Sequence, residues 1–234
     1  LAEENTEKSR AEVNKIKNNE SKAYFYKMDM SEVPSLFSSG IPEYIIPAVP
    51  CHAVAYMLAD LLKFPAWKPV TGESTIESKP VSELLIRPQY PELVSLFENL
   101  TAVFPEDIVA GSYPEQGMLF FSYAREGEIC PDSCPGPKDR CPTFGRIKPE
   151  TITDYAKKLT GKLPGWVFES HQMKPGIGGL KGMELKQNLL EILGFIKKLQ
   201  EIESEGTNKK VEEKAFFIAT TCTCHGVLNL FYVA

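Results

Sequence analysis

The chain has 234 residues, of which 43% are hydrophobic, 24% charged and 10% aromatic. This composition provides enough apolar residues for a core and excludes a disordered or fibrous chain. The net charge of −5 comes without the clustered Lys and Arg that neutralise phosphates, so we expect no nucleic-acid partner.

Membrane insertion is not expected either. No apolar run approaches the roughly 20 residues that span a bilayer, and residues 1–10 lack the pattern of a signal peptide. We therefore expect a cytoplasmic protein with no membrane partner. In that compartment the six cysteines are better explained as metal ligands or redox groups than as a disulfide framework. The sequence does not indicate an oligomeric state.

The first segment, residues 1–64, alternates predicted helices and strands. A surface helix is predicted at 5–19, a strand at 23–30, a short helix at 31–40, a strand at 43–50 and a buried helix at 51–64. Cys51 at the start of the last helix is interpreted as a core cysteine, although a helix N-terminus also favours a thiolate. Residues 65–91 are proline-rich and predicted to be irregular.

The second segment, residues 65–234, continues the alternation, and the two segments could also form one continuous domain. Strands are predicted at 118–124, 166–171, 215–221 and 227–233, with helices at 148–159 and 183–204. Thr151 or Pro149 would mark the start of the first of these helices. Because strands and helices alternate, we predict an α/β fold with a mostly parallel central sheet flanked by helices and a cysteine-rich loop lobe.

The cysteine-rich loop lies at residues 129–145, ICPDSCPGPKDRCPTFG, where each of three cysteines precedes a proline. The loop has almost no apolar residues to bury, and its prolines reduce the entropy lost when it is fixed around an ion. A second group lies near the C-terminus. We predict a metal centre that uses the three loop cysteines and takes its remaining ligand from the second group: Cys130, Cys134 and Cys141, with Cys222, Cys224 or His225.

The cofactor at this centre is predicted to be zinc or an iron–sulfur cluster. A structural zinc site takes four Cys or His ligands, whereas iron–sulfur clusters take cysteine thiolates, with a Cys-Pro pair in bacterial ferredoxins. The spacing here matches no standard ferredoxin run. The alternative is that Cys130 and Cys134 are reduced or form a disulfide, while Cys222 and Cys224 pack at a strand end.

A glycine-rich run, KPGIGGLKG at 174–182, stands between a predicted strand and the long helix. Its backbone N–H groups and the helix dipole would suit an anion, so Gly176, Gly178, Gly179 and Lys181 are candidates for binding a nucleotide or another phosphorylated ligand. The dinucleotide fingerprint is not met, and a simple tight turn explains the glycines equally well. His171, at the preceding strand end, is either a functional group or a satisfied polar histidine.

Residues 1–50 carry one resemblance. Acids at Glu3 and Glu4, a helix, the strand AYFYKMDM, a helix and the strand EYIIPAVP are similar to the later part of a Rossmann-type nucleotide-binding domain, as in potassium-uptake regulatory proteins and saccharopine dehydrogenase relatives. The resemblance covers about a fifth of the chain and implies a Rossmann-like first segment. The family's first strand and glycine loop are absent, so no cofactor-binding residue is transferred.

Two functions fit these observations. The first is a metal- or iron–sulfur-binding cytoplasmic protein, an oxidoreductase with a nucleotide or phosphorylated ligand. The second is a non-catalytic ligand-sensing or interaction module with a structural zinc site. No serine triad or paired-carboxylate pattern identifies catalytic residues, so whether the protein is an enzyme stays open.

Overall fold

The computed structural model describes residues 33–37, 40–48, 52–62, 91–131, 133–204 and 209–233. The helix predicted at 5–19, the strand at 23–30, Cys51 and nearly all of the proline-rich stretch 65–91 lie outside these residues, as does most of the Rossmann-like resemblance. None of the helices in the described part of the chain is long and apolar enough to cross a membrane.

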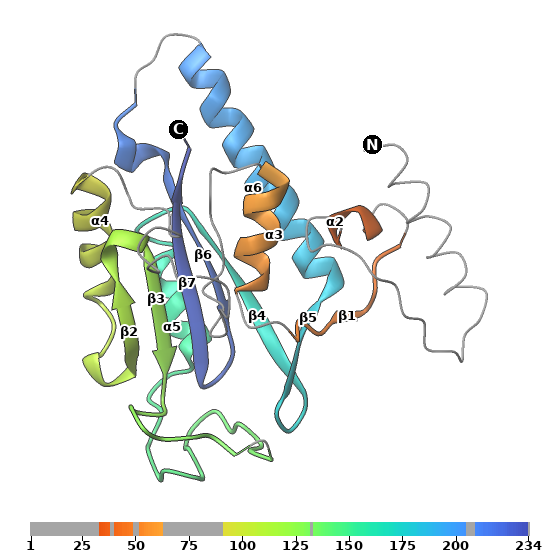
Figure 1. The fold of residues 1–234 in the computed structure, drawn as a ribbon, viewed down its shortest axis with the longest axis vertical. Helices are drawn as coiled ribbons and strands as arrows, with labels where there is room; N and C mark the ends of the chain where they lie inside the picture. Colours follow the sequence, from red (N-terminus) through yellow and green to blue (C-terminus); the bar gives the residue numbers. More distant parts are fainter. Residues whose placement is uncertain are drawn as a thin grey trace, which may run out of the picture.

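A single seven-stranded sheet forms the middle of the molecule (Figure 1). Its order is β1-β5-β4-β6-β7-β3-β2, and among the described strands only the β4–β6 pair is parallel. The strands are β1 (Tyr44–Ile45), β2 (Val109–Tyr113), β3 (Met118–Ser122), β4 (Gly165–Lys174), β5 (Ile177–Lys181), β6 (Ala215–Thr221) and β7 (His225–Tyr232).

The predicted mostly parallel, Rossmann-like sheet flanked by helices is therefore wrong: the sheet is mixed and mostly antiparallel. Short connections explain the difference, because a tight turn joins only antiparallel neighbours, whereas parallel neighbours need a long crossover. Tight turns join β4 to β5 and β6 to β7, with Lys174 paired to Ile177 and Thr221 to Gly226. The run 174–182 thus belongs to a hairpin. Its second strand, β5, lies where a glycine-rich loop was predicted.

Several predicted elements are confirmed. The strands at 118–124, 166–171, 215–221 and 227–233 correspond to β3, β4, β6 and β7, and the helices at 51–64, 148–159 and 183–204 correspond to α3, α5 and α6. The α-helices are α2 (Val33–Leu36), α3 (Ala53–Leu62), α4 (Pro91–Thr101), α5 (Ile152–Leu159) and α6 (Gly182–Ser204). Short 3₁₀ turns are η3 (Glu106–Ile108), η4 (Pro114–Gln116) and η5 (Val211–Lys214).

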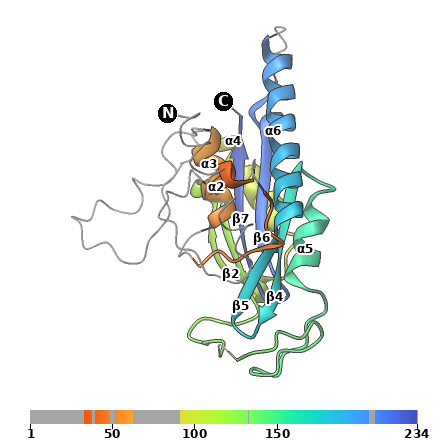
Figure 2. The ribbon, with the colours of Figure 1, turned by 90° about the vertical axis from the view of Figure 1, so that its right-hand side faces the viewer.

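The helices pack on both faces of the sheet, because alternate residues of each central strand point to opposite sides. On β6, Phe216 and Ile218 belong to a core with α3 and α6, whereas Phe217 and Ala219 belong to a core with α4 and α5. Figure 2 shows α6 running along the strands. Both cores are apolar and stabilise the sheet, whereas the described cysteines lie in the segments that connect its strands.

His52, just before α3, ties that helix to the sheet. Its ring nitrogens lie 2.6 Å from Asn229 Oδ1 on β7 and 2.8 Å from Thr220 Oγ1 on β6. Burial lowers the pKa of His52 to about 4, so the ring is neutral at pH 7 and needs no counter-charge. The described residues 33–62 thus contribute to the same sheet and core as the rest of the chain.

Gly182 offers a test of the junction where α6 begins. A Cβ there would lie 2.0 Å from the carbonyl oxygen of Pro42, so the backbone beside β1 would have to shift. We predict that Gly182→Ala destabilises the fold by about 1–3 kcal/mol. Gly194, inside α6, has nothing within 4 Å of such a Cβ, so Gly194→Ala should stabilise the fold by about 1 kcal/mol. Urea denaturation of both variants checks this, and equal changes would contradict the described junction.

Candidate metal centre

Three connecting segments meet at one end of the sheet (Figure 1). They are the long loop that follows β3, defined here as the cysteine loop (residues 124–150), the β6–β7 turn and the β4–β5 hairpin. The pairing of β3 with β7 places Ser122 opposite His225, and the next amide, Tyr123 N, donates to Cys224 O at 3.0 Å. The register of these strands therefore brings the start of the loop against the β6–β7 turn.

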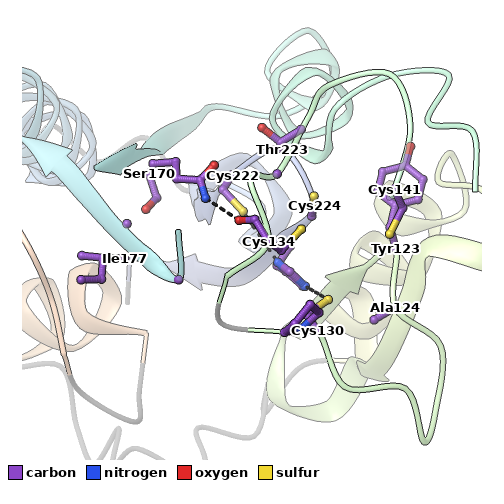
Figure 3. Close-up of a pocket in the computed structure, with 16 residues that line it drawn as sticks. Tyr123, Ala124, Cys130, Cys134, Cys141, Ser170, Ile177, Cys222, Thr223 and Cys224 are labelled. Carbon is purple, nitrogen blue, oxygen red and sulfur yellow. Dashed lines mark hydrogen bonds between the residues drawn. The ribbon is translucent and has the colours of Figure 1, made fainter. Parts of the chain in front are cut away.

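A cavity of about 320 Å³ lies between these segments and is lined by every predicted metal ligand. Figure 3 shows cysteine side chains from the loop and from the β6–β7 turn pointing into the space between them. The lining sulfur and nitrogen ligands are Cys130, Cys134, Cys141, Cys222, Cys224 and His225. Two groups more than 80 residues apart in sequence thus share one cavity, and all five described cysteines are free thiols.

The thiols disfavour one another's charge. Burial raises the pKa of Cys130, and the nearby thiols of Cys141, Cys134 and Cys224 raise it further. Burial also raises the pKa of Cys224, against the opposing effect of Lys148, and Cys222 and Cys134 add to the rise. Each thiolate would therefore gain from a positive centre placed between them.

His225 lies between two cysteines. Its Nε2 atom is 3.5 Å from Cys130 Sγ, and its Nδ1 atom is 3.9 Å from Cys222 Sγ. Burial, with the nearby charge of Lys148, lowers the pKa of His225, which favours the neutral ring that binds metals. The two sulfurs thus approach different ring nitrogens of His225.

Cys141 sits in a tight turn that presents its sulfur. The backbone N–H of Phe144 donates to Cys141 Sγ at 3.4 Å, and Cys141 N donates to Arg146 O at 2.7 Å. Gly145 closes the turn with a φ of 68°, a conformation that favours glycine. A donor aimed at the sulfur stabilises a thiolate and tunes iron–sulfur centres.

Only two described residues of the cysteine loop are buried, Cys141 and Lys148. The loop's isoleucines lie on its surface, with Ile129 87% and Ile147 76% exposed. The loop therefore has no apolar core, and its shape depends on polar contacts and on whatever its thiols bind.

Lys148 is a site residue that the sequence analysis missed. It is 3% exposed, and its Nζ donates to Cys224 Sγ at 2.8 Å and to Pro137 O at 2.5 Å. The Nζ also lies 5.8 Å from the centre of the Tyr123 ring. No sequence pattern distinguishes Lys148 from the other lysines, because its role comes from the folded loop alone.

An ion pair closes the loop at its base and was also missed. Arg146 donates to both carboxylate oxygens of Glu128, at 2.5 and 2.6 Å, and to Tyr123 O at 2.7 Å. The Arg146 side chain holds the pKa of Glu128 at about 2, with the Arg125 amide assisting. This pair fixes the two ends of the loop beside the cavity.

The glycines predicted to bind an anion lie in the β4–β5 hairpin. Gly176 and Gly178 line the cavity, whereas Gly179 and Lys181 do not, and Lys181 pairs with Glu184 at 2.9 Å. A Cβ at Gly178 would lie 2.3 Å from Ser170 Oγ, so close strand pairing is sufficient reason for that glycine. The anion site stays a prediction, but β5 separates the glycine turn from the helix that was expected to follow it directly.

His171 lies in β4 outside the cavity lining. Its Nε2 atom is 3.9 Å from Glu184 Oε2, which is too far for a hydrogen bond. Within the part of the chain that the structure describes, this nitrogen has no hydrogen-bond partner. Among the described residues, no three Cys, His, Asp or Glu side chains are placed to hold a single metal ion. The thiols surround a cavity instead of converging on one point.

The comparisons with known proteins identify the family. A family model, AF_1314_C, described as "Uncharacterized protein, C-terminal domain", matches residues 81–234. The chain belongs to this family. The matched region contains the cysteine loop, the hairpin and the β6–β7 turn. A similar protein from Archaeoglobus fulgidus, named "Uncharacterized protein", is 27% identical over 207 residues, which cover 88% of this chain and 72% of that protein. No solved structure matches the chain.

Loss of the Arg146–Glu128 pair should loosen the cysteine loop. We predict that Arg146→Gln makes the loop cleavable by chymotrypsin at Phe144 at neutral pH, whereas exposed Arg140→Gln, in the same loop, behaves like the wild type. In the wild type, the pair's contribution is complete above pH 4.5, the ordinary pKa of Glu128, and is lost as the pH falls through about 2. Pepsin should thus cut the wild-type loop only as the pH approaches 2. Equal cleavage of both variants would contradict this role.

Proposed function

We propose that this protein binds an iron–sulfur cluster in the cavity at the end of the sheet. The cluster would transfer electrons as the redox centre of an oxidoreductase. The observation that supports this most is the shared cavity: five cysteines from two distant segments line it, and the loop that supplies three of them has no apolar core. A bound cluster would supply both the positive centre that the thiolates lack and a framework for the loop.

A cluster suits this geometry better than a single ion. A mononuclear zinc site draws four ligands to one atom, whereas the four cysteines of an iron–sulfur cluster are shared among two or four irons, so their sulfurs stand further apart. The described thiols surround a cavity of about 320 Å³ without three of them converging on one point. Separated thiols around a cavity of this kind favour a polynuclear centre.

Four of the five cysteines are the best ligands. Besides burial, the thiols of Cys141, Cys134 and Cys224 raise the pKa of Cys130, so these three lie near Cys130. Cys141 and Cys224 each also accept a hydrogen bond from an N–H group. Cys222 Sγ is nearest to Nδ1 of His225, whereas Cys130 Sγ is nearest to Nε2. We assign Cys130, Cys134, Cys141 and Cys224 as ligands, with Cys222 and His225 beside them.

The cluster would supply one-electron chemistry, and the protein's residues set its surroundings. Cys130 and Cys134 are partly exposed, so this side of the centre is open to an electron-transfer partner, whereas Cys141 is buried. A reducing compartment such as the cytoplasm would keep the thiols free for ligation. A nucleotide or phosphorylated ligand at Gly176 and Gly178 would lie in the same cavity, and we keep it as part of the proposal.

Zinc is the second candidate, favoured by one observation. A neutral His225 places Nε2 3.5 Å from Cys130 Sγ, and a Cys/His pair is typical of structural zinc sites. Zinc would then only fix the loop, as a non-catalytic interaction module would need. The two candidates differ in colour, in sulfide content and in the residues that they require.

The cysteine assignment gives a direct test. We predict that anaerobically purified or reconstituted protein contains iron and acid-labile sulfide and shows broad visible absorption that bleaches on reduction. Single Ser substitutions at Cys130, Cys134, Cys141 and Cys224 should each lose most of the iron. Cys222→Ser is the matched control, since it changes a thiol of the same cavity that we do not assign as a ligand.

Two results would overturn this proposal. One is a colourless protein with one equivalent of zinc per chain, which would favour the structural site. The other is a set of Ser variants that retain iron equally, which would mean that the cavity thiols do not hold it. Circular dichroism of each variant separates lost ligation from lost folding.

A further inference from the structure

The buried lysine of the cysteine loop is the basis of this inference, which rests on the proposed function. Lys148 is one of only two buried residues that the described part of the loop contains. Lysine is almost never fully buried without a partner, because an ammonium loses its hydration there. The contacts of Lys148 therefore indicate what the cavity holds.

Within the described part of the chain, Lys148 Nζ makes polar contacts with one backbone carbonyl, Pro137 O, and one sulfur, Cys224 Sγ. Among the described residues, no carboxylate forms an ion pair with it. A neutral carbonyl does not balance a full charge, so the compensating negative charge has to come from the sulfur side. The iron ions of a cluster are positive, but its sulfides and four cysteine thiolates outweigh them. A cluster bound through Cys224 would therefore carry a net negative charge and provide that balance.

Lys148 is also fixed in place. Its backbone N–H donates to Asp139 O at 2.8 Å, and Thr151, three residues later, caps α5 by accepting from Asp154 N at 3.0 Å. The Nζ atom donates to Pro137 O, so hydrogen bonds fix both the backbone and the tip of the Lys148 side chain. The ammonium therefore keeps its position whether the centre carries more or less negative charge.

We propose that Lys148 is a built-in positive charge that stabilises the reduced form of the iron–sulfur centre and raises its reduction potential through the Nζ–H···Sγ contact with Cys224. Reduction adds one electron, taken from an external donor, and no bond is made or broken at Lys148. A fixed cation at 2.8 Å from a ligand sulfur favours the state with the extra negative charge. Lys148 acts through the ligand, so it is a tuning residue and touches no substrate.

The experiment measures the midpoint potential of reconstituted protein by spectroelectrochemistry, with iron and sulfide content determined in each sample. Lys148→Met removes the charge and the donor, and Lys148→Gln keeps a donor without the charge. Lys148→Arg keeps the charge, and Lys197→Gln removes an exposed charge on α6 as the matched control.

The expected result is a more negative potential for Lys148→Met and a smaller negative shift for Lys148→Gln, with Lys148→Arg and Lys197→Gln close to the wild type. Loss of iron in Met and Gln variants but not in the Arg variant would also support the inference, because the charge would then be needed for the centre to form.

Two results would overturn the inference alone. One is an unchanged potential in Lys148→Met at full iron content. The other is loss of iron in all three Lys148 variants, Arg included, which would make Lys148 a packing residue. Wild-type protein that takes up no iron would instead remove the proposed function and this inference with it.

Discussion

The structure of the site depends on one constraint: the cysteine loop has almost nothing apolar to bury. Among its described residues only Cys141 and Lys148 are buried, and its isoleucines face outward. Fixing such a long segment loses conformational entropy that no hydrophobic contact offsets. Polar contacts at the base of the loop hold it in part, and the proposed ligation of its thiols would supply the rest. The buried Lys148 side chain forms no ion pair with a carboxylate among the described residues, which is consistent with that proposal.

The mixed sheet brings together the cysteines that the proposed centre would use. In an antiparallel pair, the end of one strand lies beside the start of the other, so β3 delivers the loop to the point where β7 begins. The two cysteine groups meet there because of strand register. In the predicted, mostly parallel sheet, strand ends and strand starts lie at opposite edges, and the same convergence would have required a longer excursion of the loop.

Much of this could be read from the sequence, for physical reasons. Long apolar periodicity predicts α6, and the Thr151 cap predicts the start of α5. The cysteine groups were predicted to face each other because a loop without apolar residues needs another anchor. The strand residues alone do not give the sheet direction, but the short connection between the strands predicted at 215–221 and 227–233 already favours an antiparallel pair. The glycines of 174–182 could not reveal the hairpin because a hairpin and an anion-binding turn share the same residue types, and the anion site itself stays a prediction.

The polar residues that set the site were invisible in the sequence. Nothing distinguishes Lys148 or Arg146 from neighbouring Lys138 or Arg140 until the loop folds and buries one of each pair more than the other. Their roles depend on contacts made in the folded loop: Arg146 with Glu128 and a backbone carbonyl, and Lys148 with Cys224 and a backbone carbonyl. Local sequence rules predict helices, strands and caps. The residues of the candidate centre come together only through the pairing of strands far apart in the sequence.

X-ray absorption at the iron edge of the reconstituted wild-type chain tests the central claim most directly. If thiolates bind a polynuclear centre, each iron should have a first coordination shell of sulfur alone and a second shell that contains iron. Iron surrounded by oxygen or nitrogen, with no neighbouring metal, would contradict it, as would a sample in which zinc takes all of the bound metal.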